Sequence, residues 1–204
     1  MKDPKELLEY ENKEISNGVQ FIAGIDEVGR GPLAGPVVCA CVIMNLDKLI
    51  MGVNDSKKLT EKTRENLYDK IIENAVAYSI KQVDEETIDS INILNATKKC
   101  MADAVNDLKV KPQTLLVDAL IIPNIDENIK QVSIIHGDAT SYNIACASIL
   151  AKVYRDRLMV ELDKDYPEYN FKKNKGYGTA EHINALKKFG PCRLHRKSFI
   201  GHFV

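Results

Sequence analysis

The chain has 204 residues, of which 45% are hydrophobic and 28% charged, and its formal net charge is −1. This length and composition predict one globular domain, or one domain with a small appendage, with enough apolar residues for a sizeable core. No apolar run in the sequence approaches the roughly 20 residues of a membrane helix, and the first residues lack the apolar segment of a signal peptide. We therefore expect a cytoplasmic protein that does not enter a membrane.

Hydrophobic periodicity and capping residues predict an alternation of strands and helices along the chain. Asp3 and Pro4 open a polar helix that ends before Gly18. Strands are predicted at residues 21–26, 36–44, 76–83, 114–118 and 131–135. Further helices are predicted at about 60–74 with Thr60 as its cap, at 84–108 with a break near Asn92, at 141–163 and at 180–189. Strands come first and helices mix in later, so we expect an α/β fold with a mixed central sheet flanked by helices.

Basic residues are concentrated at the C-terminal end of the chain. Residues 170–204 contain eight Lys or Arg and one acid, Glu181, which leaves 20 basic and 28 acidic residues before residue 170. On charge alone, this region is either a solvated helix face or a surface for a phosphate backbone. A break in the helical pattern near residue 165 coincides with the change of charge. We expect an N-terminal helical extension at 1–19, a main domain at 20–165, and a basic helical region at 166–204 that packs on it.

The five cysteines include no C-x-x-C pair. Cys39 and Cys41 share one apolar run, at the spacing of residues on the same face of a strand. We expect all five to be reduced and mostly buried, as is typical of cytosolic proteins, and the spacing disfavours zinc ligation.

The most informative motif begins at Gly24, where Asp26 and Glu27 follow an apolar run and precede a turn rich in glycine and proline. Carboxylates are hard oxygen ligands for Mg²⁺ or Mn²⁺. Glycines allow backbone N–H groups to approach a phosphate or a sugar, and this turn has glycines on both sides of Arg30. A metal site beside an exposed backbone surface points to chemistry on a phosphodiester.

Two further acids follow predicted strands. Asp118 ends one strand, and Asp138 follows the next. Ligand sites in α/β proteins favour the ends of strands, so Asp26, Glu27, Asp118 and Asp138 are candidates for one site. Acids also terminate strands and cap helices, and any one of them alone is better explained in that way.

Asp156 is a rival candidate because it lies between two arginines. If the long helix begins near Ser141, Asp156 lies about 22 Å along its axis at ~1.5 Å per residue. Bonds from Mg²⁺ to carboxylates are only about 2.0–2.1 Å long, so Asp156 does not share a metal with Asp138. We expect Asp156 to pair with a neighbouring arginine, and Asp138 to be kept ionised by the helix dipole.

Asp26 and Glu27 raise a geometric problem, because adjacent residues of a strand point to opposite faces of the sheet. Both reach one metal centre only if the strand ends or bulges there, which Gly29 would permit.

With these residues assembled, the sequence resembles the bacterial ribonuclease HII family, the type 2 ribonucleases H, from about residue 20 to the C-terminus. A lone Gly-Arg-Gly would be weak evidence, whereas several separated motifs in the same order are specific. These motifs are Gly24-Ile25-Asp26-Glu27 through Gly35-Pro36-Val37, Asp55–Leu59, Leu116-Val117-Asp118, Gly137-Asp138, Ile144–Asp156, Lys175–Thr179 and His195–Phe199. The related type 3 enzymes have Gly-Thr-Gly-like residues at positions 29–31 and a long N-terminal extension, so Gly-Arg-Gly and the short leading segment favour type 2.

The resemblance implies a ribonuclease H-like fold and a metal site formed by Asp26, Glu27, Asp118 and Asp138. This site would hold two Mg²⁺ or Mn²⁺ ions bridged by the scissile phosphate. The implied reaction is endonucleolytic cleavage of RNA in RNA–DNA hybrids, and of duplex DNA that contains a single ribonucleotide. The cut would fall on the 5′ side of the ribonucleotide and leave a 3′-hydroxyl and a 5′-phosphate. We expect the most severe losses from substitution of Asp118 or Asp26.

The resemblance also implies contacts to the substrate. Gly29, Arg30 and Gly31 would recognise the 2′-hydroxyl, which distinguishes RNA from DNA, largely through backbone groups. Tyr177 would stack on the sugar of the next, deoxy, nucleotide. Without the resemblance, these residues are an ordinary turn and a loop anchor. Candidates for positioning the phosphate backbone are Asn54, Ser56, Lys57, Arg196 and Ser198, and the first three also fit a solvated turn before the Thr60 helix.

Three histidines, His136, His182 and His195, lie in or near these motifs. His136 stands where many family members have a lysine before the Gly-Asp pair. A neutral imidazole supplies less positive potential beside the metals, which would change metal preference or pH dependence and leave the carboxylates intact. His182 and His195 lie in basic segments, and we expect surface or structural roles for them, because hard cations prefer oxygen ligands.

Two other functions remain open at this point. The chain could be a non-catalytic nucleic-acid-binding module with vestigial carboxylates, or another nuclease of the same fold, such as a resolvase or an exonuclease, that acts on DNA. Neither explains Gly-Arg-Gly and Tyr177 together. As partners we expect RNA–DNA hybrids and DNA containing ribonucleotides, with a sliding clamp as a candidate protein partner, and we expect a monomer.

Overall fold

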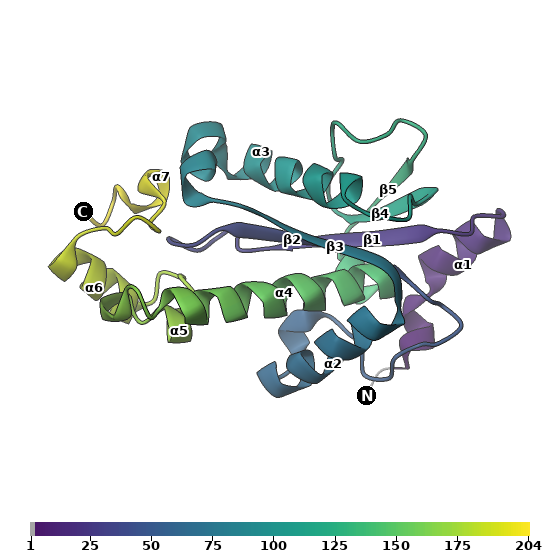
Figure 1. Cartoon of the computed structure of the whole chain (residues 1–204), viewed down its shortest axis with the longest axis horizontal. Coiled ribbons are helices and arrows are strands. Elements are labelled where there is room, and N and C mark those ends of the chain that lie inside the picture. Colours follow the sequence, from purple (N-terminus) through teal and green to yellow (C-terminus); the bar gives the residue numbers. More distant parts are fainter. Residues whose placement is uncertain (1–2) are drawn as a thin grey trace.

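The computed structural model describes residues 3–204, so residues 1–2 of the predicted N-terminal extension lie outside it. A five-stranded sheet passes through the middle of the molecule, with helices on both faces (Figure 1). The strands are β1 (Ile22–Val28), β2 (Val37–Met44), β3 (Ala75–Val83), β4 (Thr114–Asp118) and β5 (Lys130–Ile134). The α-helices are α1 (Glu9–Ser16), α2 (Glu61–Asn74), α3 (Glu85–Asn106), α4 (Tyr142–Leu162), α5 (Phe171–Asn174), α6 (Ala180–Phe189) and α7 (Lys197–Ile200). The 3-10 helices are η1 (Pro4–Leu7), η2 (Ser56–Lys58), η3 (Gly137–Ala139) and η4 (Pro167–Tyr169).

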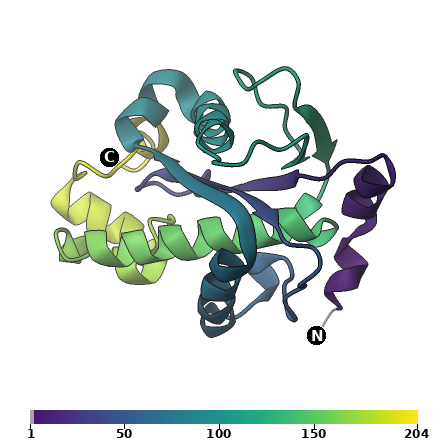
Figure 2. The ribbon, with the colours of Figure 1, turned by 45° about the vertical axis from the view of Figure 1, so that its right-hand side comes forward.

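The strand order across the sheet is β3-β2-β1-β4-β5. β1 and β3 both run antiparallel to β2, whereas β4 runs parallel to β1 and to β5. The sheet is therefore mixed, as predicted, and β1 lies at its centre. Helix α3 covers one face of the sheet, while α4, backed by α2, covers the other (Figure 2).

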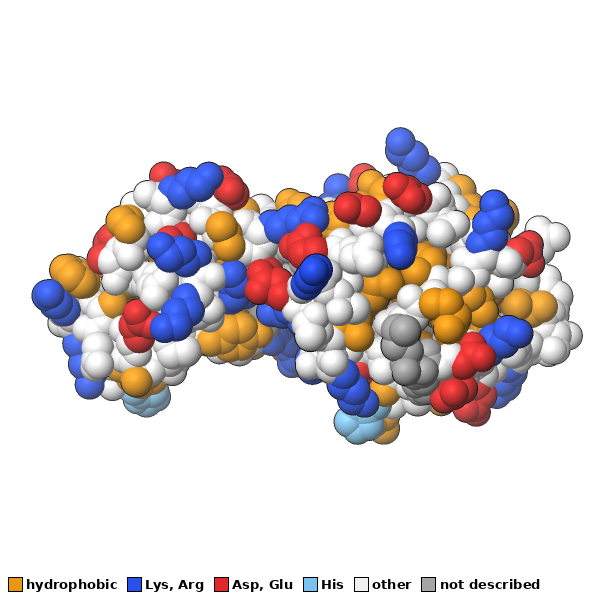
Figure 3. Space-filling view, turned by 90° about the horizontal axis from the view of Figure 1, so that it is seen from below, with side chains coloured by type: hydrophobic (Ala, Val, Ile, Leu, Met, Phe, Trp, Pro, Cys, Tyr) orange, Lys and Arg blue, Asp and Glu red, His pale blue; other side chains and the backbone are white. Residues whose placement is uncertain are grey.

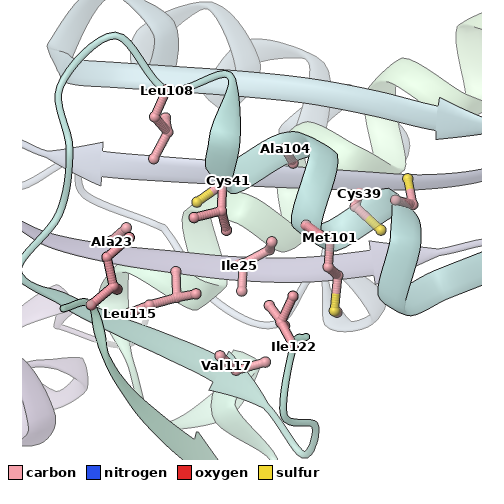
Figure 4. Packing of buried hydrophobic residues seen from close by; sticks show 14 of the residues in the cluster. Ala23, Ile25, Cys39, Cys41, Met101, Ala104, Leu108, Leu115, Val117 and Ile122 are labelled. Carbon is pink, nitrogen blue, oxygen red and sulfur yellow. The ribbon is translucent and has the colours of Figure 1, made fainter. Parts of the chain in front are cut away.

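The central strands are buried on both faces. Ile25 of β1 and Cys39 and Cys41 of β2 lie in the same hydrophobic cluster as Met101 of α3 (Figure 4). The alternate residues of β2 point to the other face and pack against α4. Four of the five cysteines are buried, as expected for thiols that serve as small apolar residues.

Local sequence features predicted most element ends correctly. The Thr60 hydroxyl accepts the N–H of Thr63 at 3.2 Å and caps α2, and Asn92 has a φ of 65° where the break in α3 was expected. Each predicted strand is present within two residues of its expected bounds. Among the helices of residues 3–204, none combines the length and the apolar character that a membrane crossing requires.

The N-terminal helix was expected to be polar, and its acids instead make buried contacts. Glu11 accepts a hydrogen bond from the Ser141 hydroxyl, the cap of α4, at 2.7 Å. Burial raises the pKa of Glu11, although a helix N-terminus favours a nearby negative charge. Glu14 accepts from the Thr114 hydroxyl at 2.9 Å and from the Lys130 ammonium at 2.7 Å. Helix α1 thereby ties the start of α4 to the first residues of β4 and β5.

The first turn of α4 lies directly against β1. A Cβ atom on Gly24 would lie 2.3 Å from the backbone carbonyl carbon of Asn143, so only glycine allows this close approach. The contact fixes the start of α4 beside the strand that carries Asp26. Because η3 immediately precedes α4, it brings Asp138 to the same place.

The C-terminal region forms one end of the molecule (Figure 1). Its own small cluster joins Tyr169 and Phe171 to Met159 of α4 and to Ala34 in the glycine-rich turn. Helix α4 ends at Leu162, close to the predicted boundary. The division into three parts stays a prediction, and the contacts show how residues 166–204 pack on the remainder of the chain.

Candidate active site

Four acids from three segments gather beside the centre of the sheet. Asp26 and Glu27 lie in β1, Asp118 is the last residue of its parallel neighbour β4, and Asp138 lies in η3. The N–H of Gly137 donates to Asp118 Oδ1 at 2.8 Å, which links the third segment to the second. The charges of Glu27, Asp118 and Asp138 all act on Asp26. The structure therefore brings together the four carboxylates that the sequence singled out.

β1 ends at Val28, one residue after Glu27, and has no bulge at the two acids. The strand continues past Asp26 and Glu27, and Glu27 remains paired with Cys39 in the ladder to β2. The pairing of β1 with its other neighbour, β4, ends earlier, at the pair Ile25–Val117. The sheet therefore opens between β1 and β4 beside Asp26 and Asp118. The two side chains leave β1 on opposite faces, and the longer Glu27 still comes close enough for the charge of Asp118 to act on it.

Burial makes the carboxylate cluster electrostatically unfavourable. Burial, followed by the charges of Glu27 and Asp118, holds the pKa of Asp26 well above its usual range. Burial also raises the pKa of Glu27 and of Asp118. Glu27 Oε2 is buried and has no hydrogen-bond partner among the described residues. Buried carboxylates with an unpartnered oxygen are a donor set that suits a hard divalent cation.

The ligand geometry of such a cation is not already in place. Within residues 3–204, no three Asp, Glu, His or Cys side chains form a closed group of metal ligands. Carboxylates repel one another, so their spacing without a cation differs from the spacing around one. The cluster fits a divalent metal by the chemistry of its donors.

The loop before α2 adds a cation beside the carboxylates. Lys57 Nζ lies 3.3 Å from Asp138 Oδ2, and 80% of the Lys57 side chain is exposed. Partial burial lowers the pKa of Lys57, but the Asp138 carboxylate outweighs it and the net direction is upward. The Ser56 hydroxyl accepts from the hydroxyl of Ser148 at 2.6 Å, and Asn54 Oδ1 accepts the next backbone N–H at 2.9 Å. The Lys57 side chain is thus exposed beside Asp138, whereas the other two side chains shape the loop.

A cleft of about 320 Å³ joins these groups. It is lined by Asp26 and Glu27, Ser56 and Lys57, Ser148 and Lys152, and Tyr177. The molecule narrows between the C-terminal region and the body, and basic side chains lie near this narrowing (Figure 3). A larger cavity of about 540 Å³ runs along the edge strand β3, where Asp107 is the only acid in its lining. The chemistry of the lining residues, and not the volume, therefore identifies the site.

Sequence reasoning missed Ser148 and Lys152 as residues of the cleft. Their i, i+4 spacing places them on one face of α4, and this spacing could have found them. Asp156 continues the same row and pairs with Lys152 Nζ at 2.7 Å and with Arg64 Nη2 at 3.8 Å. Asp156 thus pairs with an arginine, as expected, but this arginine is Arg64 of α2 and not Arg155 or Arg157 beside it in the sequence.

The two glycines around Arg30 differ in what they require. Gly29 has a φ of +95°, and a Cβ atom there would lie 2.4 Å from Nε of Arg155. Gly31 is exposed, and a Cβ atom there would meet nothing within 4 Å. The Arg30 guanidinium lies 3.4 Å from Glu27 Oε1. The fold thus requires the first glycine, while the second leaves bare backbone facing solvent.

The structure gives no support to Arg196, one of the phosphate candidates, as a phosphate ligand. Arg196 is 0% exposed, and its guanidinium donates to the carbonyl oxygens of Gly29, Arg30 and Gly35 over distances between 2.6 and 3.0 Å. These bonds use four of the five N–H donors of the guanidinium and hold the glycine-rich turn in shape.

Tyr177 lies at the cleft and is 40% exposed. The buried guanidinium of Arg155 lies 5.9 Å from the centroid of its ring and donates to the carbonyls of Pro36 and Lys175. Ser198 hydrogen-bonds to Asp89 at 2.5 Å. A carboxylate at that position repels phosphate, so the geometry gives no support to Ser198 as a phosphate ligand.

The histidines divide clearly. His182 and His195 are both buried, so the structural role is confirmed and the surface alternative is wrong. His136 is exposed and has a φ of 58°, directly before the Gly137 whose N–H holds Asp118.

Comparison with known proteins identifies the family. Residues 23–202 match the family described as Ribonuclease HII. The chain belongs to the ribonuclease HII family. The ribonuclease HII of Acetivibrio thermocellus is 55% identical over 199 residues, which cover 98% of this chain and 77% of that relative. The ribonuclease HII of Caldicellulosiruptor bescii is 52% identical over 200 residues, which cover 98% of this chain and 96% of that relative.

A solved structure supports the same conclusion. The ribonuclease HII in a complex with PCNA from Archaeoglobus fulgidus is similar, with a TM-score of 0.75 and 27% identity over 89% of this chain and 96% of that one. The predicted type 2 family and the predicted ribonuclease H-like α/β fold are therefore confirmed. The protein is a metal-dependent endoribonuclease that hydrolyses the RNA of RNA–DNA hybrids.

Proposed function

We propose that the protein cuts on the 5′ side of a ribonucleotide, both in hybrids and at single ribonucleotides embedded in duplex DNA, and leaves 3′-hydroxyl and 5′-phosphate ends. The observation that carries this proposal is the shared cleft, in which the β1 carboxylates face Tyr177. The exposed backbone at Gly31 follows Glu27 by only four residues. Groups for phosphodiester hydrolysis and groups for reading a sugar thus lie side by side.

We propose that Asp26, Glu27, Asp118 and Asp138 hold two Mg²⁺ or Mn²⁺ ions. When bound, such ions lower the pKa of an attacking water and stabilise the charge of a leaving oxygen. The protein excludes bulk water from Asp26 by burial and fixes Asp118 through the Gly137 N–H.

Three residues of the turn would read the sugar. Backbone groups of Gly29, Arg30 and Gly31 would contact the 2′-hydroxyl, because Gly31 presents no side chain and no protein atom covers it. Tyr177 would stack on the sugar of the following deoxynucleotide, with its ring backed by Arg155.

The loop before α2 would place the phosphate backbone. Lys57 would contact phosphate directly, because its ammonium is exposed beside Asp138. Asn54 and Ser56 would keep the loop in the shape that presents it, because their side chains are engaged within the protein. Phosphate contacts of this kind fix register without reading sequence.

Cleavage of three labelled duplexes tests the function: one embedded ribonucleotide, a full RNA–DNA hybrid, and plain DNA, each in Mg²⁺ and in Mn²⁺. We expect the first two duplexes to be cut and plain DNA to stay intact. A 5′ label on the cut strand should remain on a fragment that ends in a 3′-hydroxyl, just 5′ of the ribonucleotide. Cleavage of plain DNA would support another nuclease of the same fold. Binding of all three duplexes without cleavage would support a binding module. The metal series also shows whether His136 alters metal preference.

A sliding clamp is our candidate protein partner, because the archaeal ribonuclease HII similar to this chain occurs in a complex with PCNA. Co-elution of the purified protein with a clamp on a sizing column tests this proposal. The elution volume of the protein alone tests the expected monomer. The cytoplasmic location stays a prediction from the sequence.

A further inference from the structure

Two histidines lie beneath the loop that carries Tyr177. His182, in the first turn of α6, is 0% exposed, and His195, just before α7, is 3% exposed. Their Nε2 atoms are 3.0 Å apart. The rings of Tyr169 and Phe171 enclose them, with centroids 4.8 Å from His195 and 5.4 Å from His182, respectively. Neither histidine lines the cleft, so the reaction as described leaves the pair without a role.

The groups at the two ends of the pair determine where its protons lie. The backbone N–H of Cys192 can only donate, and it points at His195 Nδ1 over 3.0 Å, so that nitrogen carries no proton. His195 Nε2–H therefore donates to His182 Nε2, and His182 carries its own proton on Nδ1. That proton is donated to the carbonyl oxygen of Tyr177 at 2.9 Å. One order of donors satisfies all four ring nitrogens, and it requires two neutral imidazoles.

The surroundings keep both rings neutral. Burial lowers the pKa of His182, and burial together with the neighbouring His182 lowers the pKa of His195 to about 4. The titratable groups that face the pair are the Cys192 thiol, 3.2 Å from His195 Nδ1, and the Tyr169 phenol. Burial raises the pKa of both of these groups, so they too are neutral near pH 7. The direction of the hydrogen-bond chain is therefore fixed under physiological conditions.

We propose that His182 and His195 are positioning residues that hold Tyr177 at its place in the cleft and thereby contribute to recognition of a single ribonucleotide. The inference rests on the proposed function, in which Tyr177 stacks on the sugar next to the ribonucleotide. Two consecutive residues reach both parts of this recognition surface. His195 acts through His182 on the Tyr177 loop, and Arg196 holds the carbonyls of the glycine-rich turn. Because the two residues are adjacent, they link the backbone position of Tyr177 to that of the turn.

A series of variants tests the pair in the native chain. His182→Phe keeps a ring of similar size but removes both hydrogen bonds, whereas His182→Asn places an amide N–H where Nδ1 lies and retains the bond to Tyr177. Tyr169→Phe is the matched control, because it removes a partly buried hydrogen bond to the Gly190 carbonyl from the same cluster and leaves the pair intact. We expect His182→Phe to lower kcat/KM on the single-ribonucleotide duplex about tenfold. The other two variants should stay close to wild type.

A spectroscopic measurement tests the placement of residue 177 without reference to activity. The chain contains no tryptophan, so Tyr177→Trp introduces a unique fluorophore at the loop. In that background, His182→Phe should increase quenching by acrylamide, and His182→Asn and Tyr169→Phe should leave it unchanged. If His182→Phe lacks a cooperative thermal transition, His182→Ala replaces it, because it removes the same bond to the Tyr177 carbonyl without adding an apolar ring.

The outcomes separate this inference from the proposed function. Loss of activity and increased quenching in His182→Phe, with neither effect in Tyr169→Phe, support the positioning role. Unchanged quenching and activity in His182→Phe overturn it, and so do equal effects in Tyr169→Phe, which would indicate a general loss of packing. If the wild-type protein fails to nick the single-ribonucleotide duplex, the proposed function fails, while the tryptophan signal still decides whether the histidines hold the loop.

Discussion

The carboxylate cluster and the residues that hold the glycine-rich turn and the Tyr177 loop, here called the recognition side, differ in how their polar groups are satisfied. On the carboxylate side, burial raises the pKa of Asp26, Glu27 and Asp118, and one oxygen of Glu27 has no partner among the described residues. On the recognition side, the donors of Arg196 point at backbone carbonyls, and each ring nitrogen of the histidine pair has a partner.

This difference shows which part of the site depends on a ligand. A cluster of buried like charges destabilises the free protein, and a divalent cation would reverse that effect. The recognition side needs no cation, because its hydrogen bonds are complete within the chain, and so it keeps its shape before substrate arrives. Substitutions on the carboxylate side should therefore reduce activity more than stability. Substitutions on the recognition side should reduce stability more than activity.

The largest expected effect lies on the carboxylate side. Asp118→Asn should lower cleavage of a hybrid in Mg²⁺ about 10³-fold or more, because it removes the charge of one of the four proposed metal ligands. Asp165→Asn, at an exposed position in the loop after α4, is the matched control and should retain full activity. Near-wild-type activity of Asp118→Asn would refute the ligand assignment.

A second variant, at Arg196, should lose stability without a change in the salt dependence of substrate binding. Arg196→Lys cannot reproduce the forked bonds to three carbonyls, so we expect a loss of about 3 kcal/mol in the free energy of unfolding. Because Arg196 is buried, the salt dependence of substrate binding should not change. Lys57→Gln should show the reverse pattern. Its melting temperature should equal that of the wild type, and the slope of the logarithm of its substrate-binding constant against the logarithm of salt concentration should be smaller by about one. A reduced slope in Arg196→Lys would restore the phosphate role that the structure does not support.

A third variant should gain stability while losing function. Burial and neighbouring acids raise the pKa of Asp26, so above the normal Asp pKa the unfolded chain loses this proton more readily than the folded chain. Ionised Asp26 therefore destabilises the folded state at neutral pH, and this destabilisation decreases as pH falls and Asp26 takes up a proton. Asp26→Asn should raise the melting temperature in EDTA by a few degrees, equivalent to about 1 kcal/mol. Mg²⁺ should stabilise the wild type and not the variant, and a lowered melting temperature in EDTA would contradict the electrostatic account.

The smallest expected effect concerns acid sensitivity. The folded-state pKa of His195 is about 4, below the usual histidine value, so the unfolded chain takes up a proton first as pH falls. This residue should therefore reduce stability progressively between about pH 6.5 and pH 4. His195→Gln keeps a donor near the Nε2 position and does not titrate, so its melting temperature should fall less steeply over that window. Parallel pH profiles for variant and wild type would rule out this contribution.

Local patterns allowed much of this site to be predicted. Alternating apolar residues located β1 and β4, and the acids at their ends followed from sequence position alone. Capping by Thr60 and the break at Asn92 were equally local. Residues whose role depends on distant partners were misjudged. Arg196 looked like a surface cation because its partners lie about 160 residues earlier in the chain.

The sequence by itself indicated the family, the types of most elements and the four candidate carboxylates, because periodicity, capping and ordered motifs are properties of neighbouring residues. Only the tertiary structure decided that β1 passes through the site without a bulge, that Glu11 holds the start of α4, and that two neutral histidines support Tyr177. These features arise when segments far apart in the chain come into contact. Burial then determines whether a charged or polar side chain meets solvent, substrate or the protein's own backbone.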